Sequence, residues 1–441
     1  MKPEIKKRIE QLNKGKVPSG YKKTEFGVFS CDWVTDKKLK DIGIFGKGKG
    51  IPGDKMQSEG VPCVGYGDIY MKYNSFHFEE ARSFVDEETA KESQIIKKGT
   101  LLFTGTGETA DEIGKCVCYN GNEDIYVGGD IITFVTNQVN PLFLAYQQYQ
   151  SFSLKKKASY GQGHSVVHIQ KGELEKLNVA YPASLQEQSR IAEILMKWDK
   201  AIELYEKQIE ALKKLKTVYL SVMFPKKGET TPKYRFKGFT DPWEQRELGD
   251  LGSFKNGMNF SKEAMDKGYP FVNLQNIFGR NVIDTDNLGL AEATDTQLNE
   301  YNLLQGDVLF VRSSVKLEGV GEAALVPKFL ENTTYSGFII RFRDESNMDD
   351  NFKRFVFGIK SVRDQIMAKA TNSANKNISQ EVLNNLVVLL PSNAEQKEIG
   401  SFFSQLDTLI TLHQRKFETI SLQRKVLQQY LLNGIVRIKE C

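Results

Sequence analysis

The sequence predicts an α+β protein that contains one module twice: two mixed, mostly β domains separated by two long helices that pair as an antiparallel coiled coil. Segments 177–223 and 386–431 share one pattern at an offset of about 208 positions, the distance from Glu187 to Glu395. Each segment carries apolar residues every three or four positions, the period of an amphipathic helix. Because solenoid repeats are only about 20–50 residues long, we interpret this longer period as a duplication with a pseudo-two-fold repeat.

Composition narrows the class of protein. The 441 residues suffice for two or three domains, and 40% apolar with 26% charged residues is ordinary globular usage. A net charge of +4 is compatible with nucleic-acid binding but does not argue for it. The 5 cysteines do not suggest a secreted disulfide framework, the first residues lack the apolar core of a signal peptide, and no apolar run is long enough for a membrane span. We expect a cytoplasmic protein outside the membrane.

Changes in composition predict the domain boundaries. The predicted parts are an N-terminal helix at 1–16, a first β-rich domain at 17–181, a helical region at 182–224, a linker at 225–245, a second β-rich domain at 246–391 and a second helical region at 392–441. The two β-rich domains combine short extended runs with Gly-rich turns. Pro225 and Pro232 end the first long helix, because proline cannot continue a helix.

Both long helices carry a heptad seam, which favours a coiled coil. The seam of the first helix is Leu195, Trp198, Ile202, Tyr205, Ile209, Leu212, Lys216, Tyr219 and Met223; that of the second is Phe403, Leu406, Ile410, His413, Phe417, Ile420, Arg424, Leu427 and Leu431. Lys216 and Arg424 occupy the same repeat position, and aspartates recur at Asp199 and Asp407. The two cations either set the register of the helices or extend their tips to water.

Motifs that would indicate catalysis are incomplete. The run Gly43–Gly50 matches a phosphate-binding loop as far as Lys49, but Gly50 stands where a Ser or Thr would bind magnesium. The run Phe103–Gly107 resembles the cofactor loop of adenine methyltransferases, yet the Pro-Pro of their catalytic motif is absent from the chain. We interpret the first run as a glycine-rich turn and the second as a turn that ends a strand.

Metal binding is also poorly supported by the sequence. His164 and His168 are four positions apart in a segment without helical character, and no third ligand is near. Cys116 and Cys118 alternate along a predicted strand, so they share one face, and no second cysteine pair accompanies them. We therefore assign no catalytic and no metal-binding residue.

Polar and basic residues gather in corresponding loops of the two β domains. The candidates for DNA contact are Lys47, Lys49, Lys55, Tyr66, Lys156, Gln162 and His164 in the first domain, and Lys255, Asn273, Gln275, Arg312, Lys316, Asn375 and Lys376 in the second. Lys and Arg neutralise phosphates, while Arg, Asn and Gln match the edges of guanine and adenine. Any one of them is also compatible with a solvated loop. Because matching loops differ in polar content, we predict that each domain reads a different short sequence.

Motifs at the domain entries and ends carry a family resemblance. Both domains open with Leu-x-Asp-Ile/Leu-Gly, at Leu39 and Leu248, and the second ends in a run from Asn375 to Glu395-Gln396. The first copy departs from this run, with His168-Ile-Gln where the second has Asn377-Ile-Ser. With these motifs the chain resembles, over nearly its whole length, the specificity subunits of type I restriction-modification systems.

The resemblance implies two target-recognition domains that each read one half of a split, asymmetric site in double-stranded DNA, with the paired helices fixing the gap. It implies that this chain alone is not an enzyme. It implies assembly with two methyltransferase subunits, docked on the outward helix faces, and two restriction/translocase subunits. S-adenosylmethionine, ATP and Mg would then be used by those partners, and this chain would bind no cofactor.

Two other functions remain open from the residues alone. Duplicated β modules on a helical spacer could form a scaffold that binds proteins or glycans, which a gel shift with random duplex would distinguish. The chain could also be a self-sufficient restriction or methylation enzyme, in which case it would transfer methyl groups to DNA without a partner.

Overall fold

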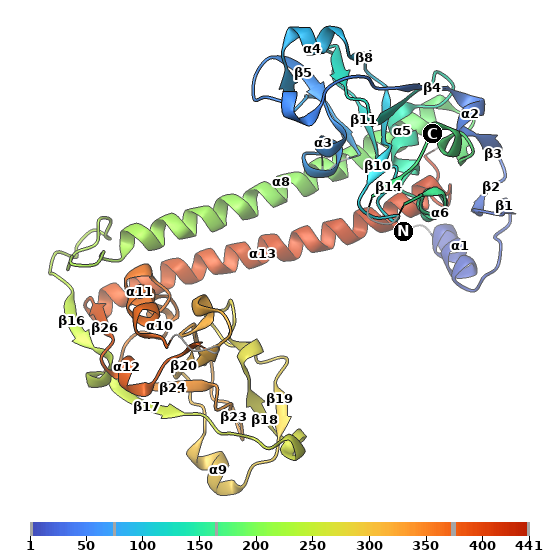
Figure 1. Cartoon of the computed structure of the whole chain (residues 1–441). Helices are drawn as coiled ribbons and strands as arrows, with labels where there is room; N and C mark the ends of the chain where they lie inside the picture. The colour runs from blue at the N-terminus through green and yellow to red at the C-terminus, as the bar shows by residue number, and fades with distance from the viewer. Residues whose placement is uncertain (1–2, 74–75, 164–165, 372–375, 439–441) are drawn as a thin grey trace. The chain divides into compact units, whose positions relative to one another are not determined.

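The computed structural model describes residues 3–73, 76–163, 166–371 and 376–438. The chain divides into two compact units: unit 1 comprises Met1–Tyr205 and Lys416–Cys441, and unit 2 comprises Glu206–Arg415. The long helices α8 (Leu185–Met223) and α13 (Asn393–Leu432) contribute to both units (Figure 1). Each unit therefore contains one β-rich domain and one half of each long helix.

In each unit the two long helices run in opposite directions. In unit 1, Leu195 of α8 shares a core with Leu431 of α13, and further along, Asp199 pairs with Arg424. In unit 2, Tyr219 of α8 contacts Phe402 of α13 with ring centroids 5.1 Å apart, and Lys216 pairs with Asp407. The residues of both predicted seams are buried or half-buried. This confirms the seams and the antiparallel pairing within each unit, while supercoiling stays a prediction.

Unit 1 contains a larger and a smaller sheet. The larger sheet runs in the order β4 (Ile44–Lys47), β13 (Ile131–Val135), β9 (Leu101–Thr104), β11 (Cys116–Tyr119) and β6 (His77–Phe78). The smaller sheet runs in the order β7 (Ser83–Val85), β5 (Val61–Val64), β12 (Ile125–Val127) and β8 (Gln94–Ile96). Short pairs join β1 (Tyr21–Thr24) to β2 (Gly27–Ser30), β3 (Trp33–Lys38) to β15 (Asn178–Pro182), and β10 (Thr106–Gly107) to β14 (Val167–His168). The helices are α1 (Pro3–Asn13), α2 (Leu39–Ile42), η1 (Gly53–Lys55), α3 (Tyr66–Met71), α4 (Glu87–Lys91), α5 (Pro141–Gln147), α6 (Ser151–Tyr160) and α7 (Lys171–Leu174).

Unit 2 repeats this topology. Its larger sheet, in the order β17 (Gly252–Asn256), β24 (Ile339–Asp344), β20 (Val308–Val311) and β22 (Ala323–Leu325), corresponds strand by strand to β4-β13-β9-β11. Its smaller sheet, in the order β19 (Gly289–Ala291), β18 (Met265–Val272) and β23 (Thr334–Tyr335), corresponds to β7-β5-β12. Short pairs join β16 (Glu244–Glu247) to β26 (Val387–Leu390) and β21 (Ser313–Ser314) to β25 (Lys376–Asn377). The helices are η2 (Leu248–Asp250), η3 (Lys262–Ala264), η4 (Leu274–Asn276), α9 (Asp295–Glu300), η5 (Leu317–Gly319), α10 (Asp350–Val356), α11 (Lys360–Lys369) and α12 (Gln380–Asn384).

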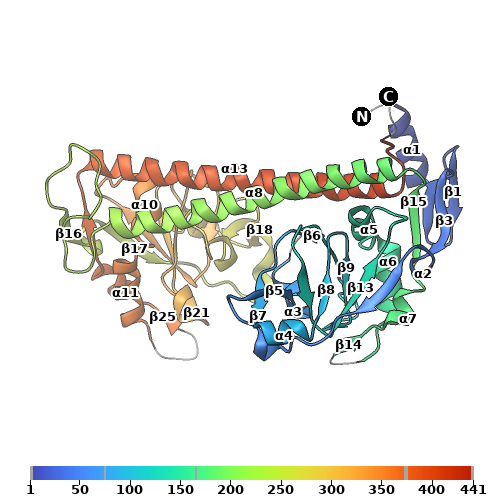
Figure 2. The same cartoon turned by 90° about the horizontal axis from the view of Figure 1, so that it is seen from above.

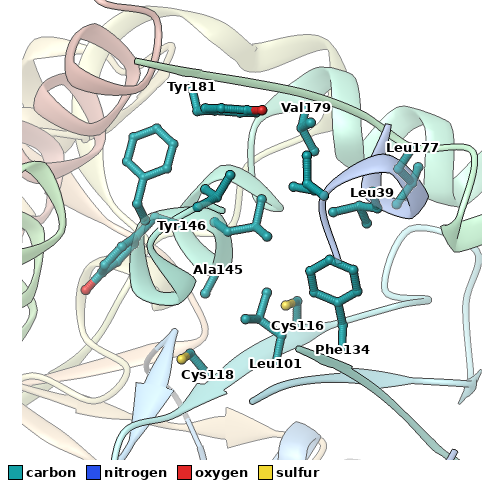
Figure 3. Packing of buried hydrophobic residues seen from close by; sticks show 14 of the residues in the cluster. Leu39, Leu101, Cys116, Cys118, Phe134, Ala145, Tyr146, Leu177, Val179 and Tyr181 are labelled. Carbon is teal, nitrogen blue, oxygen red and sulfur yellow. The ribbon is translucent and has the colours of Figure 1, made fainter. Parts of the chain in front are cut away.

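The core of unit 1 lies between the larger sheet and the start of α8. Figure 3 shows Cys116 and Cys118 of β11 on the side of the sheet that carries Leu101 and faces Tyr146. Both thiols are fully buried in this cluster, which confirms that they share one face. Burial raises the pKa of Cys116 to about 12, so the thiol stays protonated and packs as a small apolar group. Within the described ranges, no three His, Cys, Asp or Glu residues are grouped as metal ligands.

The repeated Glu-Gln pair joins each domain to its long helix. In unit 1, Gln188 accepts a hydrogen bond from the Asn140 backbone N–H at 2.7 Å and donates one to the Pro182 carbonyl at 2.7 Å. In unit 2, Gln396 makes the same two bonds, to Asp349 at 3.1 Å and to Pro391 at 3.0 Å. Asn140 and Asp349 in turn cap the N-termini of α5 and α10.

The glutamates of the same motif hold the segments that follow the long helices. Glu187 pairs with Arg437, downstream of α13, at 2.6 Å, and Glu395 pairs with Arg235, downstream of α8, at 2.7 Å. Both glutamates are buried, so each charge is compensated by a guanidinium that donates in bidentate geometry. The segment after α13 is therefore held at the start of α8, beside the first β-rich domain. The segment after α8 is held in the same way at the start of α13, beside the second β-rich domain.

The recurring charges of the seams pair with the recurring aspartates. In unit 1, Arg424 Nε donates to Asp199 at 2.7 Å, and Tyr146 donates to the same carboxylate at 2.7 Å. In unit 2, Lys216 donates to Asp407, which also accepts from Asn281 at 2.8 Å. Because both cations bond across to the opposite helix, the structure favours the register role over cations that extend to water.

No helix in the described part of the chain combines the length and apolar character needed to cross a membrane.

Candidate DNA-reading surfaces

In unit 2, three predicted DNA contacts meet at a short two-stranded ribbon, β21–β25. Lys376 of β25 stands opposite Ser314 of β21. Arg312 immediately precedes the ribbon, where its carbonyl accepts a hydrogen bond from Ile378, and Lys316 follows it in an exposed position. The ribbon lies on the side of the domain away from the long helices (Figure 2). Three cationic side chains are thereby gathered on one outward surface.

Asn273 and Gln275 belong to the same surface. Asn273 is the N-cap of η4, with its side-chain oxygen 2.8 Å from the Leu274 backbone N, and Gln275 is exposed in the first turn. Leu274 lines a pocket of about 530 Å³ together with Ser314 and Lys316, which places η4 beside the ribbon. Gln275 is the exposed neighbour of Leu274 in this short helix.

The equivalent surface of unit 1 contains Tyr66 and Gln162. Tyr66 begins α3 and is exposed, and Tyr70 of the same helix bonds the Thr106 carbonyl of β10 at 3.1 Å. Gln162 forms an antiparallel bridge with His168, whose ring nitrogen lies 3.2 Å from the Thr106 hydroxyl. These contacts join α3, β10 and β14 into one surface. The predicted residues His164 and Asn375 lie outside the described residues.

Lys47 and Lys255 lie on strands, so the prediction that they belong to corresponding loops was wrong. Lys47 ends β4 and Lys255 lies in β17, and each strand pairs with a partner that comes later in the sequence. Long-range pairing of this kind has no local signal in the Gly-rich runs. Lys255 already pairs with Glu300 at 2.7 Å, so part of its charge is compensated within the domain. The run Gly43–Gly50 is accordingly not a turn over Ile44–Lys47, whereas Phe103–Gly107 does end strand β9 at Thr104.

Lys49 and Lys55 are exposed near the smaller sheet of unit 1. The backbone N–H of Lys49 donates to Val127 at 3.2 Å, and Lys55 ends the short helix η1. No contact that the structure describes brings these two lysines to the surface formed by α3, β10 and β14. They stay predicted phosphate contacts at a separate place in the domain.

Lys156 lies on helix α6, and its prediction as a loop residue was also wrong. Its Nζ is exposed, 5.0 Å from the ring centroid of Tyr160. The neighbouring Lys157 is buried instead, and donates to the Gly114 carbonyl at 2.8 Å. Burial lowers the pKa of Lys157 to about 8. Because successive residues of a helix lie on different faces, Lys156 is exposed to solvent whereas Lys157 is buried in the domain.

Sequence reasoning missed the residues that differ most between the two surfaces. In unit 2 these are Phe278, Val315 and Phe338, which are 38%, 79% and 57% exposed. In unit 1 the position equivalent to Phe278 is Tyr70. Aligning β9 with β20 along the repeat would have found Val315, because this alignment sets it against Glu108.

A family model described as "Type I restriction modification DNA specificity domain" matches the chain twice, over residues 31–214 and 240–422. The chain belongs to this specificity family. Each match begins near the tryptophan that enters a β domain, Trp33 or Trp243, and extends into the following long helix. The chain is thus a DNA specificity subunit of a type I restriction-modification system.

Individual relatives agree with the family match. The type I restriction enzyme MjaVIII specificity subunit of Methanocaldococcus jannaschii is 24% identical, over 78% of this chain and 81% of that protein. The type I restriction enzyme EcoKI specificity subunit of Escherichia coli is 27% identical, over 73% of this chain and 71% of that protein. The crystal structure of the type I restriction-modification S subunit from M. genitalium has the same fold, with a TM-score of 0.57, 14% identity and coverage of 90% of this chain and 96% of that one.

Proposed function

We propose that this specificity subunit recognises a bipartite DNA site, one half through each domain, with a gap fixed by α8 and α13. The observation that carries the proposal is that the two domains share one strand order but present different side chains on equivalent surfaces. Unit 2 presents Arg312, Lys316 and Lys376, whereas unit 1 presents Tyr66 and Gln162. Two similar scaffolds with unlike surfaces suit two unlike half-sites.

The proposal assigns catalysis to partner subunits. Two methyltransferase subunits dock on the outward faces of the long helices, where Leu204, Leu412 and Leu422 are exposed, and two restriction/translocase subunits complete the assembly. S-adenosylmethionine, ATP and Mg act in those partners, and this chain works in the cytoplasm without a bound cofactor. Labelled S-adenosylmethionine incubated with duplex DNA and this chain alone should give no transfer; transfer without a partner would refute the assignment.

The gap is tested by lengthening both helices. Seven residues inserted after Lys207 in α8 and after Arg415 in α13 leave the Asp199–Arg424 and Lys216–Asp407 pairs on their own sides of the insertions. One heptad adds about 10 Å, or roughly three base pairs of B-DNA. Single-molecule sequencing of methyl-adenine, made by the complex with its methyltransferase subunits, should show both half-sites unchanged and the gap about three base pairs longer.

The division into half-sites is tested by a matched pair of variants. Gln275→Ala should relax base preference in one half-site only, and Tyr66→Ala in the other half-site only, because Gln275 lies on η4 of one domain and Tyr66 on the corresponding helix α3 of the other. Changes in both halves from either variant, or altered half-sites at an unchanged gap in the heptad variant, would contradict the proposal.

A further inference from the structure

The DNA-reading surface of unit 2 contains an apolar pocket. Its volume is about 530 Å³, and its wall includes Leu274, Phe278, Val315 and Phe338. Val315 is 79% exposed and Phe338 is 57% exposed, although both lie among polar neighbours at the ribbon β21–β25. Solvent-exposed apolar side chains gathered at a ligand-facing surface indicate that they are covered when the ligand binds.

The pocket is held in place by backbone contacts. Arg312 donates its backbone N–H to the Phe338 carbonyl at 2.8 Å, and its guanidinium reaches the Gly337 carbonyl at 3.3 Å. A side chain at Gly319 would come within 3.1 Å of the Phe278 ring, which shows that this ring packs closely on the η5 backbone. The Phe278 ring and the Phe338 backbone are therefore positioned by the fold before any ligand arrives.

Charge around the pocket selects the part of DNA that can enter it. Lys316 lines the pocket, and Lys376 stands on the adjacent strand. Glu318 and Glu322 also line it, and Glu322 accepts a hydrogen bond from the Gly279 N–H at 2.7 Å. Two carboxylates disfavour a phosphate inside the pocket, while the lysines favour phosphates near it. This arrangement suits a base edge in the pocket and the backbone outside.

Unit 1 has no such apolar wall among the equivalent described positions. Tyr70 takes the place of Phe278, and its hydroxyl bonds Thr104 at 2.7 Å. Glu108 takes the place of Val315 and Asp130 that of Phe338. A side chain at Gly107 would lie 2.8 Å from the Tyr70 hydroxyl, so the tyrosine fills the corresponding space. The apolar pocket is a property of the second domain.

We propose that Val315 and Phe338 contact the C5-methyl group of a thymine, so that this pocket specifies an A·T pair in the half-site read by the second domain. The major groove admits a two-stranded β-ribbon, and the thymine methyl is the apolar feature exposed there. The ribbon β21–β25 carries Val315 at its end, next to the cations that hold phosphates. This inference rests on the proposed function, and it adds the chemistry of one recognised base.

The test replaces thymine by uracil, which removes one methyl group and leaves base pairing unchanged. The complex with its methyltransferase subunits is bound to duplexes that carry the site found by methylation mapping, with each thymine of both half-sites replaced in turn. One thymine should weaken binding roughly fourfold when it becomes uracil, the factor that corresponds to burial of one methyl group. Val315→Ala should abolish this difference, and Glu108→Ala, its counterpart in unit 1, should leave it unchanged.

The outcomes are distinguishable. A uracil effect that disappears in Val315→Ala, with an unchanged melting temperature for the variant, supports the proposal. A wild-type complex that binds its site with no uracil effect at any thymine, or an effect that persists in both Val315→Ala and Phe338→Ala, overturns it. A complex that shows no preference for any duplex over random competitor would instead refute the proposed function.

Discussion

The two domains are built alike where they meet the long helices and unlike where they face outward. Gln188 and Gln396 make the same pair of hydrogen bonds, and Glu187 and Glu395 each hold an arginine from the segment after a long helix. On the outward ribbons, by contrast, Glu108 corresponds to Val315. The comparison shows that the Glu-Gln contacts which hold a domain on its helix recur in both copies, whereas the side chains on the outward surfaces differ.

The largest expected effect on stability comes from breaking the buried Glu395–Arg235 ion pair in unit 2. Glu395 is fully buried and its carboxylate receives two bonds from Arg235, both 2.7 Å. Glu395→Ala leaves that guanidinium without its carboxylate, so we expect the free energy of unfolding to fall by about 3–5 kcal/mol. Calorimetric unfolding of the full chain would measure it.

Glu187→Ala is the matched variant in unit 1 and should cost less. Arg437 keeps a second carboxylate, Asp32, at 2.6 Å, so its charge stays compensated when Glu187 is removed. If Glu187→Ala lowered the free energy of unfolding as much as Glu395→Ala or more, the Glu187–Arg437 and Glu395–Arg235 pairs would differ in more than the extra partner Asp32.

A smaller effect of opposite sign is expected at a buried lysine. Lys157 packs against Gly114 in unit 1, and Ile366 packs against Gly321 in the same way in unit 2. Because burial lowers the pKa of Lys157 from near 10.5 to about 8, the folded chain is penalised when this lysine is charged. Lys157→Met should therefore stabilise the protein at pH 7 by about 2–3 kcal/mol.

The pH dependence gives this prediction its check. Below pH 8 both the folded and the unfolded chain hold the Lys157 proton, so the lysine adds no slope. Between about pH 8 and 10.5 the unfolded chain holds a proton that the folded chain has released, so wild-type stability gains with rising pH. The advantage of Lys157→Met should shrink across this window; a constant advantage would mean that the pKa of Lys157 is not lowered in the folded protein.

The smallest expected effect concerns a single phosphate contact. Lys316→Ala should weaken binding of the complex by about 1 kcal/mol on every duplex alike and reduce the slope of log K against log salt by about one. Thr109→Ala, at the equivalent position of unit 1, should change neither quantity. If Lys316→Ala altered the preferred bases instead, the lysine would contact a base edge rather than the backbone.

The sequence predicted the long helices well, because their burial follows a local period. Lys216 and Arg424 stood out against the apolar seam, and their partners Asp407 and Asp199 could be found by the repeat offset. The site was harder to predict. Lys47, Lys255 and Lys376 look like loop residues, since the strands that contain them depend on partners far along the chain.

The partners of the Glu-Gln motif show the same limit. Arg235 and Arg437 lie 160 and 250 residues from Glu395 and Glu187, and no periodicity connects such positions. Val315 and Phe338 were missed for a different reason: an isolated apolar residue in a loop gives no signal until the fold brings several together.

The division of the chain between the units has a consequence for biosynthesis. Unit 2 is one continuous stretch, so all of it has left the ribosome soon after Arg415 is added. Unit 1 is begun first but needs Arg437, almost the last residue described, to neutralise Glu187. During translation unit 2 is therefore complete before unit 1, whose core lacks Leu431 and Leu432 until the end of α13 has been added.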